Sequence, residues 1–133
     1  MIKNRNIHED AKIKTICIPI VAQAGGVDSA DIPFFCAAKD ITIVAIGVLP
    51  HAAIDEHADG SVILIETGST AIATRTYGTD LDYTAAEYEA LTLVAAEADQ
   101  VEGSVLTYSI TNGAGGSSPA MTLQMDYYVN ECI

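Results

Sequence analysis

Residues 61–77 read SVILIETGSTAIATRTY, and this stretch decides the fold class that the sequence predicts. Two runs rich in β-branched residues, 61–67 and 70–77, flank the turn dipeptide Gly68-Ser69. Alternating apolar and polar residues on either side of a glycine-containing turn are typical of a β-hairpin. We therefore expect two antiparallel strands here, each with one face directed into a core.

The same period-two alternation extends outward from the hairpin in both directions. In residues 12–21, Ile16, Ile18 and Ile20 share one face, and Pro19 indicates an edge strand or a strand end. Further strands are expected at 31–38, 41–48, 90–94, 104–111 and 120–129. The last of these is the most regular, with Met121, Leu123, Met125, Tyr127 and Val129 expected inward and Thr122, Gln124 and Asp126 outward.

These segments predict a single all-β domain. About eight antiparallel strands fit a β-sandwich, jelly-roll-like in topology, with an extended N-terminal arm. We expect residues 1–14 to form a basic arm and residues 15–133 the sandwich domain. No segment between the strands is long enough for the crossover helices of a βαβ fold. Residues 83–101 stay ambiguous, because 90–94 resembles a short strand whereas the Ala and Glu content favours helix, with one helical turn possible at 84–89.

Charge restricts the classes of partner. The chain has 18 acidic and 6 basic residues and a net charge of −12, which argues against binding to nucleic acid or to an anionic membrane surface. Four of the six basic residues lie in the first 14 positions: Lys3, Arg5, Lys12 and Lys14. Two interpretations stay open for them: a solvated terminus, or an arm that docks on an acidic neighbour such as the next copy of the same protein.

Cysteine usage and hydropathy bear on the location of the protein. Cys17, Cys36 and Cys132 form no CxxC pair, and we expect Cys17 and Cys36 to be small buried residues in a protein made in a reducing compartment. The N-terminus lacks the apolar run of a signal peptide, and no stretch of 18 apolar residues occurs. Neither secretion nor a membrane span is therefore expected.

Common catalytic and nucleotide-binding motifs are missing from the sequence, and we expect no enzymatic activity and no cofactor. The best metal candidate is the acidic turn 55–60, DEHADG, followed by Asp80 and Asp82. A calcium loop needs a fuller ladder of ligands, so a solvated turn is preferred and no metal is predicted. The glycine-rich segment 112–119 is expected to be a mobile hairpin connection, since no helix follows it. The six tyrosines are expected to pack in a core or an interface.

Two segments resemble a known group of proteins. Residues 18–54, IPIVAQAGGVDSADIPFFCAAKDITIVAIGVLPHAAI, and residues 101–129, VEGSVLTYSITNGAGGSSPAMTLQMDYYV, resemble the two halves of small jelly-roll proteins from tailed-bacteriophage structural modules. In that group an ADIPFFVA-like strand leads into a strand that ends near VPQAA, and a glycine-rich loop precedes the closing strand. Residues 55–89 match less well, and Glu102-Gly103 stands where the group has a Gly-Asp turn.

The resemblance implies a virion structural protein, in particular a capsid decoration (cement) protein that binds the outside of the head shell and stabilises it. The implied partners are the major capsid protein and further copies of the chain, in a homotrimer or other homo-oligomer. The implied location is the capsid surface, after assembly in the bacterial host cytoplasm, with Lys3, Arg5, Lys12 and Lys14 as a docking arm.

An alternative of a different class is a carbohydrate- or receptor-binding module of a phage head fibre or tail. Such a module predicts a groove lined by exposed tyrosines, or calcium bound at Asp55, Asp59 or the Asp80/Asp82 pair. A cupin-like enzyme on the same fold is a third class, but the sequence lacks its His/Glu ligand pattern.

Overall fold

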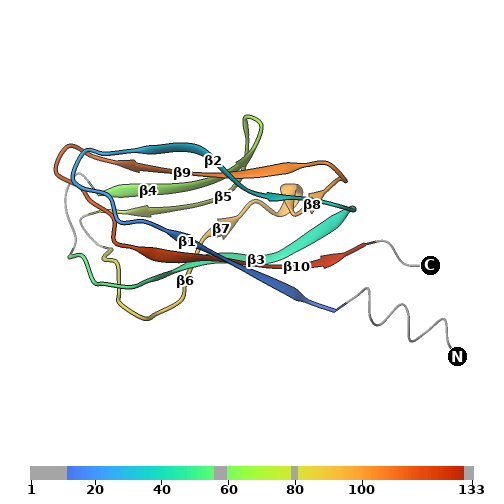
Figure 1. The fold of residues 1–133 in the computed structure, drawn as a ribbon, viewed down its shortest axis with the longest axis horizontal. Helices are drawn as coiled ribbons and strands as arrows, with labels where there is room; N and C mark the ends of the chain where they lie inside the picture. The colour runs from blue at the N-terminus through green and yellow to red at the C-terminus, as the bar shows by residue number, and fades with distance from the viewer. Residues whose placement is uncertain (1–11, 56–59, 79–80, 131–133) are drawn as a thin grey trace, which may run out of the picture.

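A computed structural model describes residues 12–55, 60–78 and 81–130 of the chain. These residues form two β-sheets packed face to face as a sandwich (Figure 1). Within the described ranges there is one 3₁₀ turn, Ala95–Glu97, and no α-helix, so no helix there could span a membrane. The all-β class predicted from the alternation is confirmed.

The strand order of the two sheets is that of a jelly roll. The first sheet has the order β1 (Lys14–Ile20), β10 (Met121–Val129), β3 (Ile41–Pro50) and β6 (Glu89–Ala90), and β8 (Asp99–Gln100) also pairs with β3. The second has the order β2 (Ser29–Cys36), β9 (Val105–Asn112), β4 (Ser61–Thr67), β5 (Thr70–Tyr77) and β7 (Thr92–Leu93). Consecutive strands lie in opposite sheets except at the β4–β5 hairpin. This alternation confirms the predicted topology.

The core between the sheets is mainly aliphatic. Ile63 and Ile65 of β4, and Met121, Leu123 and Met125 of β10, are at most 1% exposed. Each set occupies alternate positions of its strand, so the period-two pattern of the sequence places the correct face inward. Farther along β10, the predicted inward residues Tyr127 and Val129 are only partly buried.

The predicted hairpin at residues 61–77 is confirmed. Ser61 pairs with Tyr77 and Thr67 pairs with Thr70. Gly68 lies in the turn with a φ of +59°, a left-handed conformation that glycine adopts without a steric penalty. The glycine turn and the apolar–polar alternation on both sides of it therefore both favour this hairpin.

The ambiguous residues 83–101 form neither one helix nor one strand. The chain pairs with β3 through β6, crosses to β5 through β7, and returns to β3 through β8. Its 3₁₀ turn, Ala95–Glu97, lies downstream of the helical turn considered at 84–89. Alanine-rich composition favours helix, but this segment hydrogen-bonds to two sheets in succession, and the tertiary pairing overrides the local propensity.

The glycine-rich segment after β9 is tied to two other loops. Gly113 N donates to Gly60 O at 3.0 Å, and Gly26 N donates to Gly116 O at 3.1 Å. A Cβ at residue 116 would clash with Gly60 O, so only glycine allows this approach of the two loops. Backbone hydrogen bonds thus hold a segment for which the sequence predicts a mobile connection.

Candidate interaction surfaces

The two long sides of the sandwich differ in construction. On one side, residues 89–100 cover the gap between β3 and β5, and we call this side the sealed edge (Figure 1). Leu91 N donates to Ile46 O of β3 at 2.9 Å, and Val94 N donates to Ile72 O of β5 at 2.8 Å. One connecting segment therefore joins both sheets through backbone hydrogen bonds.

A buried polar cluster lies at the sealed edge. Glu89 is 7% exposed and accepts hydrogen bonds from Tyr77 Oη at 2.7 Å and from Thr84 N at 3.2 Å. Arg75 of β5 places Nη2 4.0 Å from Glu89 Oε2 and donates from Nη1 to Ala90 O at 2.9 Å. The carboxylate and the guanidinium thus connect β5 to β6, which belong to different sheets.

Two tyrosine rings extend this cluster. Tyr77 and Tyr83 stack with their ring centroids 3.7 Å apart, and Tyr83 Oη hydrogen-bonds to Ser61 Oγ. Burial and the hydrogen bond to Glu89 raise the pKa of Tyr77 well above its usual range, and burial raises the pKa of Tyr83 to about 12. Because both hydroxyls and the carboxylate are engaged within the cluster, we assign it a structural role.

Sequence reasoning did not find this cluster, because its members come from β4, β5, β6 and the loop between the last two. The one available signal was Arg75, since only Lys39 and Arg75 are basic beyond position 14. A lone cation on a strand of an acidic chain calls for an acidic partner, but the pattern does not identify which of the 18 acidic residues provides it.

On the other side, the edge strands β1 and β2 have no covering strand among the described residues, and we call this side the open edge. Pro19 lies in β1 and Pro33 in β2. Proline has no N–H group to pair with an added strand, so both edges are protected against strand addition. The edge position that Pro19 predicts for its strand is confirmed.

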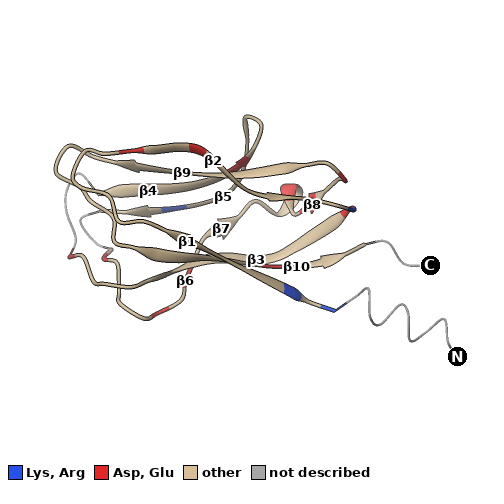
Figure 2. Cartoon of the chain, in the orientation of Figure 1, with Lys and Arg blue, Asp and Glu red and all other residues tan. Residues whose placement is uncertain are grey.

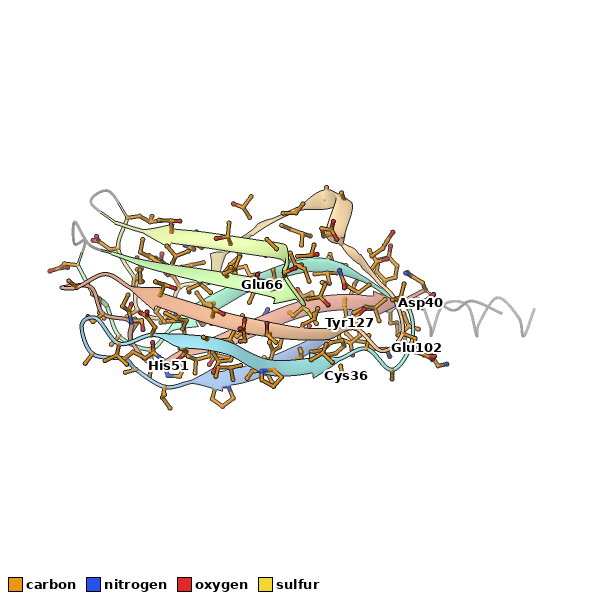
Figure 3. The ribbon with its side chains drawn as sticks, turned by 90° about the horizontal axis from the view of Figure 1, so that it is seen from above. Cys36, Asp40, His51, Glu66, Glu102 and Tyr127 are labelled. Carbon is orange, nitrogen blue, oxygen red and sulfur yellow. The ribbon has the colours of Figure 1, made fainter. Side chains whose placement is uncertain are left out.

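The open edge ends in an apolar cavity of about 210 Å³, which we call the end groove. Its apolar lining comes from both sheets: Phe35 of β2, Ile41 of β3, and Tyr127 and Val129 of β10. The rings of Phe35 and Tyr127 meet edge to face, with centroids 5.1 Å apart. Figure 3 shows Cys36 and Tyr127 at the end of the molecule that also carries Asp40 and Glu102, far from His51.

The predicted basic arm is described only at its last residues. Lys14 is the first residue of β1, pairs with Tyr127 and contributes to the lining of the end groove. Lys12 is exposed, and Lys3 and Arg5 lie outside the described residues. The sheet therefore begins at Lys14, and the groove lies where the arm joins the sandwich.

Cys17 and Cys36 are both exposed, so the expectation that they are buried is wrong. Ile16 and Ile18 are packed against the core, and the intervening residue of a strand points to the opposite face. Cys17 consequently lies on the outer face of the first sheet. Cys36 ends the edge strand β2, where it borders the end groove. Cys132 lies outside the described residues.

The described residues give little support to the candidate metal and sugar sites. Asp55 and Asp82 are exposed, whereas residues 56–59 and 79–80 lie outside the described ranges. Within those ranges no group of three or more His, Cys, Asp or Glu side chains could hold a metal ion. Tyr77, Tyr83 and Tyr108 are buried, which agrees with core packing, and Tyr88 is the one described tyrosine classed as exposed.

The outer faces of both sheets have uncharged central rows, although the chain carries a net charge of −12. On the first sheet, Cys17, Gln124, Gly47 and Ala90 are cross-strand neighbours. On the second sheet, Thr74, Leu64 and Ser109 form the corresponding row. Most acidic residues lie in connections or on edge strands, but Asp126 lies within β10, an inner strand of the first sheet (Figure 2). Each row is therefore a narrow strip that another protein can cover without burying a charge, flanked by Asp126 on the first face and Glu66 on the second.

Comparisons with known proteins show no family. No family model matches the chain, and no curated protein sequence is significantly similar to it. Among solved structures, it resembles a subunit of the disulfide-linked pili that form Bacillus endospore appendages, with a TM-score of 0.45, 15% identity, and coverage of 90% of this chain and 88% of that one.

A second similar structure is the VP2 subviral particle of infectious bursal disease virus. It gives a TM-score of 0.39 and 16% identity, covering 91% of this chain, which spans 34% of the VP2 chain. At these TM-scores both matches are distant, and neither carries an argument about function.

Proposed function

We propose that this chain is a structural protein that works by binding to other protein surfaces, and specifically that it is a capsid decoration protein of a tailed-bacteriophage virion. The observation that carries the proposal is the pair of uncharged rows on the outer sheet faces of a strongly acidic chain. Interface centres are depleted in charged residues, whereas a face that stays in water usually carries them.

The fold suits such a role because it presents these faces on a rigid support. Sheet residues are locked by the antiparallel ladders, and the Arg75–Glu89 contact together with residues 89–100 joins the two sheets along one side. A rigid face loses little conformational freedom on binding, so less of the contact energy is spent on ordering. Repeated attachment of many copies to a symmetric shell then multiplies a modest affinity.

The proposed partners are the major capsid protein and other copies of the chain, in a homotrimer or other homo-oligomer on the capsid surface after assembly in the host cytoplasm. The basic residues Lys3, Arg5, Lys12 and Lys14 contribute an arm that contacts an acidic neighbour. Function by attachment requires no catalytic step, and we propose none.

Co-sedimentation with heads of the phage that encodes the chain tests this proposal. We expect saturable binding at a ratio set by the symmetry of the shell. Leu64→Lys and Gln124→Lys each place a cation in the middle of one outer face, so the variant at the docking face should lose binding. Ser69→Lys adds the same charge at the exposed hairpin tip and serves as the control.

Deletion of residues 1–11 tests the arm and leaves β1 intact, because β1 begins at Lys14. Weaker attachment of the truncated protein would assign Lys3 and Arg5 to the arm, and unchanged attachment would remove these two residues from the proposal. If the full chain does not bind heads at any concentration, the decoration function is wrong.

A further inference from the structure

The end groove is suited to receive one aliphatic side chain. Its volume is about 210 Å³, and an apolar cavity of roughly 150 Å³ already accommodates a benzene ring. Phe35, Ile41, Tyr127 and Val129 give it an apolar lining, and Ala38 borders it as an exposed residue. In a single chain the apolar side chains that line the cavity are exposed to water, which is unfavourable. A partner side chain that fills the cavity removes this apolar surface from water.

The opposite end of the sandwich carries a partly exposed aliphatic side chain, Leu81. Leu81 is 38% exposed, and its backbone is held by two hydrogen bonds to Gly78: Gly78 N donates to Leu81 O and Leu81 N donates to Gly78 O, both at 3.4 Å. Asp82 follows it and is exposed. An aliphatic side chain is thus presented next to a carboxylate, and we call Leu81 and Asp82 the acidic tip.

The charges of the two features are also complementary. Lys14 lines the groove, and no ion pair joins it to another described residue. Lys39 lines the groove as well, while Asp40 and Glu102 border a neighbouring depression at the same end. A carboxylate that enters from the Lys14 side meets a cation, whereas an approach over Asp40 and Glu102 meets like charge. The favourable contact is therefore confined to the open edge.

From this fit we propose that copies of the chain associate head to tail, the acidic tip of one copy entering the end groove of the next. Leu81 packs against Phe35 and Tyr127, and Asp82 pairs with Lys14 at the side of the groove. The groove and the tip are different surfaces at opposite ends, so the contact is heterologous and produces an open row or a closed ring. The inference rests on the proposed structural function and specifies how its copies contact one another.

Sedimentation velocity of the full chain over a range of concentrations tests the inference. We expect association that Leu81→Asn weakens by about tenfold or more, because it removes the side chain that fills the groove. Val21→Asn is the matched control, since Val21 is an aliphatic residue with 76% exposure that follows the end of β1. This control should associate like the original chain.

Four further variants test the groove and the charge pair without removing a core residue. Ala38→Trp fills the groove from an exposed position and should also abolish association. Lys14→Glu and Asp82→Lys should each weaken association, and the double variant should restore it, since the pair is then reversed. Circular dichroism confirms that each variant is folded.

A chain that stays monomeric up to about 1 mM would overturn the inference. Association that is unaffected by Leu81→Asn and Ala38→Trp would overturn it too, because another surface would then be responsible. The head-binding assay separates this result from the proposed function: a monomer that binds heads contradicts only the head-to-tail contact, and a self-associating chain that ignores heads contradicts only the decoration function.

Discussion

The sealed edge and the open edge solve the same problem in different ways. Both must prevent the exposed backbone of an edge strand from pairing with another chain. The sealed edge does so with a covering segment and a buried polar cluster around Glu89, whereas the open edge relies on Pro19 and Pro33. Only the first solution also joins the two sheets, so we expect stability to be concentrated on the sealed side, whereas the open side carries the end groove.

The largest expected effect is at the sealed edge. Glu89→Ala removes the acceptor for Tyr77 Oη and Thr84 N and leaves Arg75 without its carboxylate. We expect a loss of about 3 kcal/mol in the free energy of unfolding, measured by urea denaturation. Glu102→Ala, an exposed acid at one end of the sandwich, is the control and should change stability by less than about 0.5 kcal/mol. Equal losses in both variants would contradict the proposed division of roles.

The second effect is a loss of stability at alkaline pH. Burial raises the pKa of Tyr83 to about 12 in the folded protein, against a usual value near 10 when unfolded. The folded state then holds the proton more tightly, so this contribution is complete below pH 10 and is lost as the pH rises towards 12, amounting to roughly 2–3 kcal/mol. Tyr77 acts in the same direction.

Urea denaturation at several pH values between 9 and 12 measures this dependence. Tyr83→Phe has no phenolic proton and should show a flatter decline of stability over the same interval. A decline equally steep in the variant would assign it to other groups.

A smaller effect is expected for apolar truncation at the open edge. Phe35→Ala should cost about 1–2 kcal/mol, below the 3–5 kcal/mol typical of a fully buried phenylalanine, because the end groove already exposes this ring. Leu91→Ala at the sealed edge, where Leu91 is 5% exposed, should cost about 2–3 kcal/mol despite the smaller side chain. Thermal or urea unfolding measures the loss of stability in each variant. A larger loss for Phe35→Ala than for Leu91→Ala would contradict the expectation that stability is concentrated at the sealed edge.

The smallest effect concerns the two thiols on the open side. Cys17→Ser and Cys36→Ser should each change stability by less than about 0.5 kcal/mol, because both side chains are exposed. In the folded, dilute protein both thiols should react with a maleimide, as mass spectrometry of the labelled peptides can show. Cys36 borders the end groove, so its labelling should slow at concentrations where head-to-tail association occurs, whereas that of Cys17 should not.

The cysteines also show how two sequence rules can conflict. The general tendency of cysteine to be buried predicts an inward Cys17, but the inward positions of Ile16, Ile18 and Ile20 require Cys17 to face outward. The periodicity was correct and the compositional tendency was not. Strand geometry applies to each residue of the segment, whereas a compositional tendency describes only an average over many proteins.

Local pattern was sufficient for the fold class, the 61–77 hairpin, the edge position of β1 and the inward face of β10. Each of these depends on residues within one or two strands, and alternation and turn chemistry act over that distance. Residues 83–101 were the exception, since their course depends on hydrogen bonds to β3 and β5.

The tertiary structure alone decided where the surfaces lie. Arg75 meets Glu89 only because β5 and β6 face each other across the two sheets, and Phe35 meets Tyr127 only because β2 and β10 end at the same point. The cluster and the groove each require side chains from strands distant in the sequence. Periodicity indicates which face of a strand is buried, but the pairing of strands determines which residues share a site.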